Sequence, residues 1–232
     1  MIRNTAKTAS IALLLASLIF VSGAGADDIN LPDMGSPADA VLSTNDESRL
    51  GRMIMRDIRR SGQVVEDPLV IEYVNDIGSR VVAQTNDGDH DFTFFVIDDA
   101  RINAFALPGG RMVFSAGLIE NAGSPDEVAG VLAHELGHVA LRHPEAAIVR
   151  VYGLQMLLSL FTAGQGADSL GSIAGVIAVL RYSREAEAEA DAYAVQVMEK
   201  AKVDPKGLRT FFTRLIKKKT GSGTETKSDD ST

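Results

Sequence analysis

The sequence contains no cysteine and no tryptophan, and only four of its 232 residues are histidines. Without cysteine the chain can form neither a disulfide nor a thiolate metal site, so its stability must come from a hydrophobic core and any metal ligand must be an imidazole or an oxygen group. Positive charge is also scarce, because 23 Lys and Arg stand against 31 Asp and Glu, a net charge of −8. This acidic balance makes nucleic acid and anionic lipid poor candidate partners.

Long hydrophobic runs are missing as well, and the run at the N-terminus is too short for an ordinary membrane span. It covers residues 11–21, follows Arg3 and Lys7, and ends in a series of small residues. This pattern is typical of a secretory signal peptide. We therefore expect a signal peptide over residues 1–26, an extended leader over residues 27–43 and a periplasmic location. The alternative is an uncleaved N-terminal anchor.

A strong helix signal lies in the middle of the chain. Ser124 is a suitable N-cap, Pro125 fits the first helical position, and Glu127 follows three residues after the cap. The pattern predicts a helix from about Pro125 to Leu141.

This predicted helix carries an HExxH motif. His134 and His138 are four residues apart, so both imidazoles project from one face and can bind one metal ion, with Glu135 beside them to deprotonate a water. Zinc is the expected ion, and the alternative is a core helix with two incidental histidines. His143 lies too far around the helix to join them, which makes it a surface or supporting residue. With His90 the only other histidine, the third ligand is expected to be a carboxylate.

Candidate carboxylates occur in the stretch 181–193, where acidic residues alternate with alanine. Ala and Glu favour helix over strand, so we predict a helix despite the alternation. On this helix Glu187 and Asp191 share one face, and Glu185 and Glu189 share another. The spacing does not decide which pair faces a metal, and a wholly solvated acidic face is the alternative.

Three short segments are predicted to be strands, at 92–97, 102–107 and 111–115, the last two forming a hairpin. Helices are predicted at 44–60 and 68–83. Together these elements indicate a mainly helical α+β fold with a small β-sheet. An exposed edge of that sheet could pair with an extended peptide, although an ordinary sheet explains the pattern equally well.

The apolar segments 151–163 and 170–180 are each too short to cross a bilayer. We interpret both as helices that pack in the core, with peripheral membrane contact through 151–180 as the alternative. The tail 217–232 is rich in Gly, Ser, Thr and charge, so we expect it to be disordered.

Three motifs together resemble one known family. The sequence from about Glu47 to Leu215 is similar to the zinc metallopeptidases of the CAAX prenyl protease and HtpX type, metallopeptidase family forty-eight, and within it to the exported BepA-like bacterial branch. The segments that carry the resemblance are His134-Glu-Leu-Gly-His138, Asn103-Ala-Phe-Ala-Leu-Pro-Gly-Gly110, and Ser183-Arg184 with Glu187 and Asp191. Three motifs in the right order are more specific than HExxH alone.

The resemblance implies a role for each motif residue. Glu187 would be the third zinc ligand, Asp191 would support a ligating histidine, and Glu135 would activate water. The segment that begins Asn103, Ala104 and Phe105 would be the substrate-binding edge strand, facing the active site of a zincin (gluzincin-like) fold. The tetratricopeptide repeats of longer relatives do not follow here.

We therefore expect residues 44–216 to form one zinc endopeptidase domain, with one zinc ion, that cleaves unfolded, misfolded or misassembled envelope proteins in protein quality control. The alternative function is a zinc-binding, non-catalytic or chaperone-like envelope scaffold. The family's downstream His-Pro segment is also missing, so Arg181, Arg184 or a partner would have to stabilise the oxyanion.

Overall fold

The computed structural model describes residues 42–85, 91–153, 180 and 182–221. The elements are, in chain order, α2 (Thr44–Arg60), α3 (Pro68–Val82), β1 (Thr93–Ile97), β2 (Ala104–Leu107), β3 (Arg111–Ser115), α4 (Ala116–Asn121), α5 (Pro125–Ala140), α6 (His143–Tyr152), α9 (Arg184–Lys200) and α10 (Lys206–Gly221). The predicted mainly helical α+β fold is therefore confirmed. Among these residues no helix has the length and apolar content needed to cross a bilayer.

The sheet has the strand order β1-β3-β2. β3 lies in the middle, parallel to β1 and antiparallel to β2. Gly109 and Gly110 form the β2–β3 turn with φ of 71° and 76°, a backbone region that glycine adopts without strain. The predicted hairpin is confirmed, and β2 is an edge strand of the described sheet.

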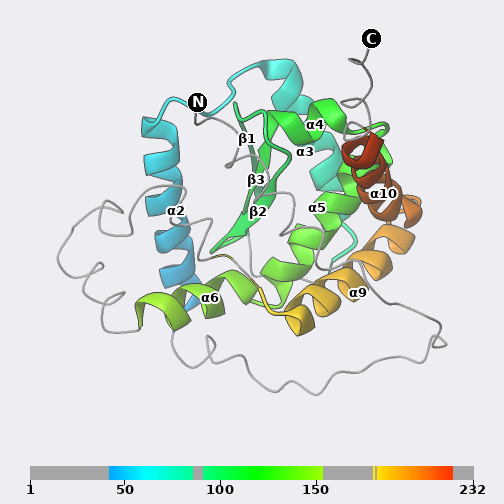
Figure 1. Cartoon of the computed structure of the whole chain (residues 1–232). Coiled ribbons are helices and arrows are strands. Elements are labelled where there is room, and N and C mark those ends of the chain that lie inside the picture. The colour runs from blue at the N-terminus through cyan, green and yellow to red at the C-terminus, as the bar shows by residue number, and fades with distance from the viewer. Residues whose placement is uncertain (1–41, 86–90, 154–179, 181, 222–232) are drawn as a thin grey trace, which may run out of the picture.

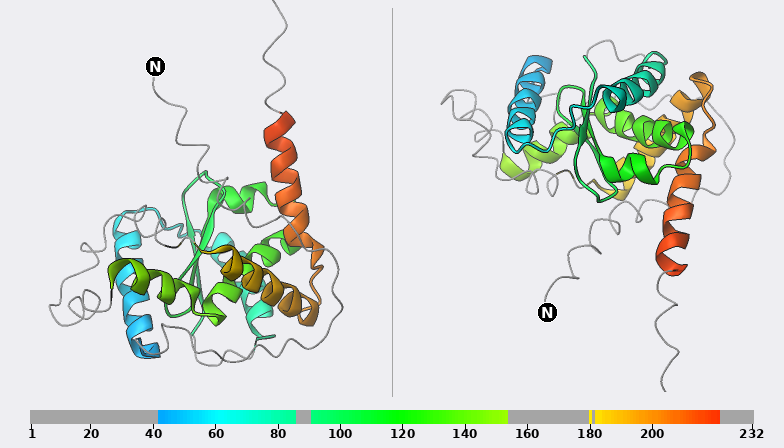
Figure 2. Two further views of the ribbon diagram at one scale, coloured as in Figure 1. Left: turned by 60° about the horizontal axis from the view of Figure 1, so that its bottom comes forward. Right: turned by 90° about the horizontal axis from the view of Figure 1, so that it is seen from above.

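The two faces of the sheet are covered by different helices, as Figures 1 and 2 show. Successive side chains of a strand point to opposite faces, so each strand contributes to two hydrophobic clusters. On one face Phe105, Leu107 and Val113 pack with α2. On the other face the strand residues that pack with α3 and α5 are Val96, Ala104, Ala106, Met112 and Phe114. Helix α5 thus lies in the interior of the domain.

Two more helices cover the side of α5 that the sheet leaves open. The contact of α9 with α5 is especially close, because a methyl group added at Gly137 would lie 2.9 Å from the Cα and the carbonyl oxygen of Ala190. Helix α10 packs on α5 as well, and Arg214 on α10 forms an ion pair with Glu127 in the first turn of α5. The interior helix is therefore held from both sides.

The structure differs from the sequence expectations in two places. Helix α6 begins at His143, directly after a turn in which Arg142 has φ 56°, whereas the sequence predicted a helix from residue 151. Most of the predicted segment 151–180 lies outside the described residues. Helix α10 continues to Gly221, so residues 217–221 are helical where the sequence predicted the start of a disordered tail. Residues 1–41 and 222–232, with the expected signal peptide, most of the leader and the rest of the tail, also lie outside the described residues.

We predict that Gly137→Ala destabilises the protein even though alanine favours helix over glycine. The added methyl group would meet backbone atoms of Ala190, and overpacking of this kind costs about 1–3 kcal/mol. Urea denaturation followed by circular dichroism measures the free energy of unfolding. The control is Gln196→Ala on the exposed face of α9, which should change it by less than about 0.5 kcal/mol. A Gly137→Ala protein as stable as the wild type would show that the two helices are not in close contact.

Candidate metal centre

The HExxH residues lie on the buried helix α5. Its first turn is capped by the Ser124 side chain, which accepts a hydrogen bond from the backbone N–H of Glu127, as the sequence pattern predicts. His134 is 6% exposed, Glu135 4% and His138 1%. Buried polar side chains of this kind need partners close by, and each of the three has them.

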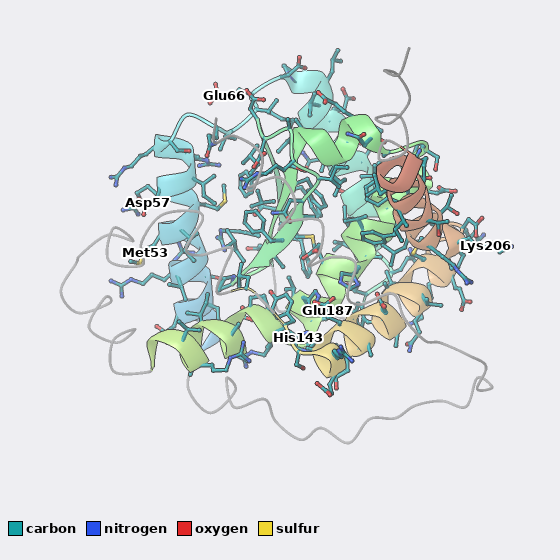
Figure 3. The ribbon with its side chains drawn as sticks, viewed as in Figure 1. Met53, Asp57, Glu66, His143, Glu187 and Lys206 are labelled. Atoms are coloured by element: carbon teal, nitrogen blue, oxygen red, sulfur yellow. The ribbon has the colours of Figure 1, made fainter. Side chains whose placement is uncertain are left out.

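Three side-chain atoms converge between α5 and α9. His134 Nε2 and His138 Nε2 are 3.1 Å apart, and Oε2 of Glu187, at the start of α9, lies 3.3 Å from the first and 3.9 Å from the second. Figure 3 labels Glu187 where α9 and α6 meet near the end of α5. Spacing alone left the choice between the Glu187 and Glu185 faces open, and the structure brings Glu187 to the histidines.

This triangle fits a tetrahedral ion. Zinc bonds of about 2.0–2.1 Å would separate neighbouring ligand atoms by about 3.3 Å, close to two of the observed distances, while the Glu187–His138 distance of 3.9 Å is longer. Two imidazole nitrogens and one carboxylate oxygen also form a donor set that zinc accepts, with a fourth position left for water. The described residues therefore contain a set of side chains suited to a metal ion.

The other nitrogen of each histidine ring has its own partner. His134 Nδ1 donates to Asp191 Oδ1 at 2.8 Å, and His138 Nδ1 lies 2.8 Å from His143 Nδ1. His143 Nε2 is in turn 3.2 Å from Glu189 Oε2. Such contacts fix the tautomer, since a proton on each ligand's Nδ1 leaves the Nε2 lone pair directed at the metal position.

The contacts of His143 and Glu189 with the site were not predicted from the sequence. His143 does not reach the metal position, as expected, but it is an orienting partner of His138 rather than a surface residue. Glu189 is half-exposed, yet it contacts His143, so the face expected to point only to water also supports the site.

The electrostatics of the cluster favour positive charge. Burial lowers the pKa of His134, but its hydrogen bonds to Asp191 and Glu187 and the charge of Glu135 outweigh burial and raise this pKa to about 10. Burial and the charges of His134 and His143 lower the pKa of His138. A proton on His134 is favoured by the same carboxylates that would favour a bound cation.

Glu135 lies beside the cluster and is bonded to the sheet. Burial raises its pKa to about 7, with a further increase from Glu187, while the charge of His134 and a hydrogen bond from the Ala106 backbone N–H act in the opposite direction. A carboxylate whose pKa is near neutrality is suited to accept and return a proton at physiological pH. Ala106 belongs to β2, so the edge strand is next to the candidate base.

The predicted edge-strand residues are in β2 and just before it. Asn103 precedes the strand, where its backbone N–H and C=O bond to the Ser115 hydroxyl, and Ala104 and Phe105 are buried on opposite faces. Their side chains hold the strand in the core, and all four residues of β2 are buried. The role of this edge stays a prediction.

Tyr182 was not identified from the sequence. Its ring stacks on that of His138, with centroids 4.0 Å apart and planes 22° apart. Its hydroxyl is buried and has no hydrogen-bond partner in the described part of the chain. Burial and the charges of Glu135, Glu145 and Glu187 raise the pKa of this phenol. In the sequence its only signal is its position next to Ser183, the residue that caps α9.

We predict that the orienting contacts set metal affinity. His143→Ala and Asp191→Ala should each weaken binding of a divalent metal by about 10–100-fold, because each frees one ligand ring to rotate. Competition with a chromogenic chelator measures the affinity. Glu185→Ala, at a fully exposed position on the same helix, is the matched control and should leave it unchanged. Equal affinity in the wild type and both variants would remove these contacts from the site.

The family model described as Peptidase family M48 matches residues 68–228. The beta-barrel assembly-enhancing protease of Escherichia coli K12 is 32% identical over 222 residues, 89% of this chain and 45% of the relative. The same-named protein of Yersinia pestis is 33% identical over 227 residues, 88% of this chain and 46% of the relative.

A eukaryotic relative shares a shorter part. The mitochondrial metalloendopeptidase OMA1 of Schizosaccharomyces pombe is 30% identical over 147 residues, 62% of this chain and 43% of the relative. The chain spans less than half the length of each of these curated relatives. The family match covers both histidine-bearing α5 and the glutamate of α9, and the chain belongs to peptidase family M48, a family of metallopeptidases.

Proposed function

We propose that this chain is a zinc-dependent endopeptidase that hydrolyses peptide bonds in exported envelope proteins that are misfolded or misassembled. The observation that carries the proposal is the convergence of His134, His138 and Glu187 on one point with buried Glu135 beside it. Zinc is favoured over harder ions such as magnesium or calcium because two of the three donors are imidazoles.

The chemistry follows from the neighbours of that point. Bound zinc would polarise the scissile carbonyl and acidify a water. The Ala106 N–H holds the Glu135 carboxylate in position. Glu135 accepts a proton from the attacking water and passes it to the leaving amine. β2 is an edge strand of the described sheet, and an edge strand can align an extended peptide by main-chain hydrogen bonds, which demand little of the peptide's sequence.

Tyr182 is the side chain we assign to the developing oxyanion. The sequence pointed to Arg181 or Arg184, but Arg181 lies outside the described residues and Arg184 is exposed. The hydroxyl of Tyr182 is buried next to the catalytic carboxylates and free to donate. A donor already in place at the site of developing charge lowers the barrier without further rearrangement.

The substrate class and the location rest on two supports. The bacterial relatives are named for enhancing assembly of beta-barrels, and the N-terminal pattern is typical of a secretory signal. We therefore place the enzyme in the periplasm, acting on polypeptides that have failed to assemble. The competing function, a non-catalytic scaffold that keeps zinc for structure, gives no role to Glu135, since a structural site needs no base.

We predict that Glu135→Gln and Glu187→Ala fail in different ways. Glu135→Gln should keep the metal and lose casein cleavage by about 10²–10⁴-fold, because only the base is removed. Glu187→Ala should lose the metal together with the activity. Elemental analysis and a casein digestion with and without chelator test both. Equal zinc content in Glu187→Ala and wild type would remove Glu187 from the ligands, and chelator-insensitive cleavage would exclude the proposed chemistry.

We also predict that Tyr182→Phe lowers kcat by about a hundredfold with KM and metal content little changed. Phenylalanine keeps the ring that stacks on His138 and removes only the hydroxyl. Peptide hydrolysis under saturating substrate separates kcat from KM. Tyr73→Phe, which removes a hydroxyl from α3, a helix that carries none of the proposed site residues, is the control. An unchanged kcat in Tyr182→Phe would assign the oxyanion contact to another group.

A further inference from the structure

The outer face of α2 is a stripe of arginines. Five exposed arginines lie on this helix, and at about 100° per residue their side chains fall within an arc of about 100°. They are Arg49, Arg52, Arg56, Arg59 and Arg60. We call these five residues the arginine stripe. It runs along most of the helix, on the side opposite the apolar residues that pack on the sheet.

Part of this charge is not neutralised by carboxylates in the described part of the chain. Asp57 pairs with Arg60 at 3.3 Å in an exposed contact, and Figure 3 shows Asp57 on the side of α2 turned away from the sheet. Arg52 and Arg56 make no ion pair with a described carboxylate. Arg59 lies over the Phe95 ring instead of beside an acid. Arg52 and Arg56 therefore present their charge to the surroundings, and the exposed pair with Asp57 neutralises Arg60 only weakly.

A sixth arginine shows how crowded the positive charge is. Burial lowers the pKa of Arg111, at the start of β3, and so do the charges of Arg52 and Arg59, against the opposing effect of Asp91. The repulsion between these like charges decreases when an anionic surface covers them. The net charge of −8 thus does not describe this face, because the acidic helix α9 lies at the opposite end of the molecule (Figures 1 and 2).

We propose that the arginine stripe docks the protein on an anionic phospholipid surface. Planar guanidinium groups bind phosphate oxygens in pairs, and lipid phosphates can move laterally to meet them. A protein partner would instead require an apolar centre to its interface. No large exposed hydrophobic side chain lies on α2; within the described ranges such side chains are Leu69, Ile71, Val151, Val195 and Ile216. The contact is therefore electrostatic and stays at the level of the headgroups.

This docking would orient the metal centre. The sheet separates α2 from α5, so the histidines lie on the side of the sheet away from the stripe. Arg142, which follows α5, bonds the Leu42 carbonyl and buried Glu47, and this contact fixes α2 against the catalytic side of the domain. An enzyme held by α2 would keep α9 and the metal centre turned away from the lipid. The inference goes beyond the proposed function and requires neither metal nor catalysis.

The test is binding of the full chain to vesicles. Vesicles that contain phosphatidylglycerol are compared with phosphatidylcholine vesicles by co-sedimentation at low and raised salt. The variant is Arg52→Gln/Arg56→Gln/Arg60→Gln. Its control is Arg80→Gln/Lys200→Gln/Arg209→Gln, which removes the same charge from exposed positions on α3, α9 and α10. The apolar segment 11–21 is present in every sample, so its contribution to binding cancels in the comparison.

Each basic residue near an anionic membrane contributes roughly fivefold to affinity. The affinity of the stripe variant for phosphatidylglycerol vesicles should therefore fall on the order of a hundredfold. The affinity of the control variant should fall at most a few-fold. Salt should weaken wild-type binding. Circular dichroism verifies that both variants fold.

Three results would overturn the proposal. Equal losses in the two variants would show that only net charge matters, and equal wild-type binding to both kinds of vesicle would exclude anionic recognition. Binding of the wild type to polyglutamate without binding to phosphatidylglycerol vesicles would assign the stripe to an acidic protein instead. Casein cleavage without vesicles should be the same in the stripe variant and the wild type, so failure here is separable from failure of the proposed function.

Discussion

The close approach of α9 to α5 is the contact on which the metal centre depends. Gly137 has no Cβ, and the backbone of α9 lies so close to it that a Cβ would be in contact with Ala190. Only this close packing lets the carboxylates of α9 reach the histidines of α5. Glu187 then meets both Nε2 atoms, and Asp191 meets the far nitrogen of His134. The glycine inside HExxH is therefore as much a part of the site as the residues that name the motif. Without it the same side chains would sit on two helices held too far apart.

The sequence predicted the parts of the site that local geometry determines. Helix α5, its Ser124 cap and the common face of His134 and His138 all follow from spacing along one helix. The choice between Glu187 and Glu185 did not, because both faces of α9 are equally acidic and the decision lies in how α9 docks on α5. The resemblance to known metallopeptidases selected Glu187 where spacing could not.

Contacts that depend on the path of the chain between helices could not be predicted from the sequence. His143 reaches His138 because the chain turns at Arg142 through a left-handed residue and starts α6 at once. Non-glycine residues seldom adopt that conformation, and no sequence pattern around Arg142 predicts it. Tyr182 stacks on His138 because the chain enters α9 beside the site. The amino-acid composition did not predict the arginine stripe either, because the net charge is a sum over all faces of the folded molecule.

The burial of the site has an energetic consequence for the whole domain. His134, Glu135 and His138 occupy the central helix, where apolar side chains would stabilise the fold more, and burial alone disfavours the charged form of each. At His134 the hydrogen bonds to Asp191 and Glu187 outweigh the effect of burial. A cation bound only by the folded state would compensate further, since ligand binding and folding are linked. Burial of Glu135 and His138 thus lowers the stability of the metal-free core, and a bound cation would restore part of that stability.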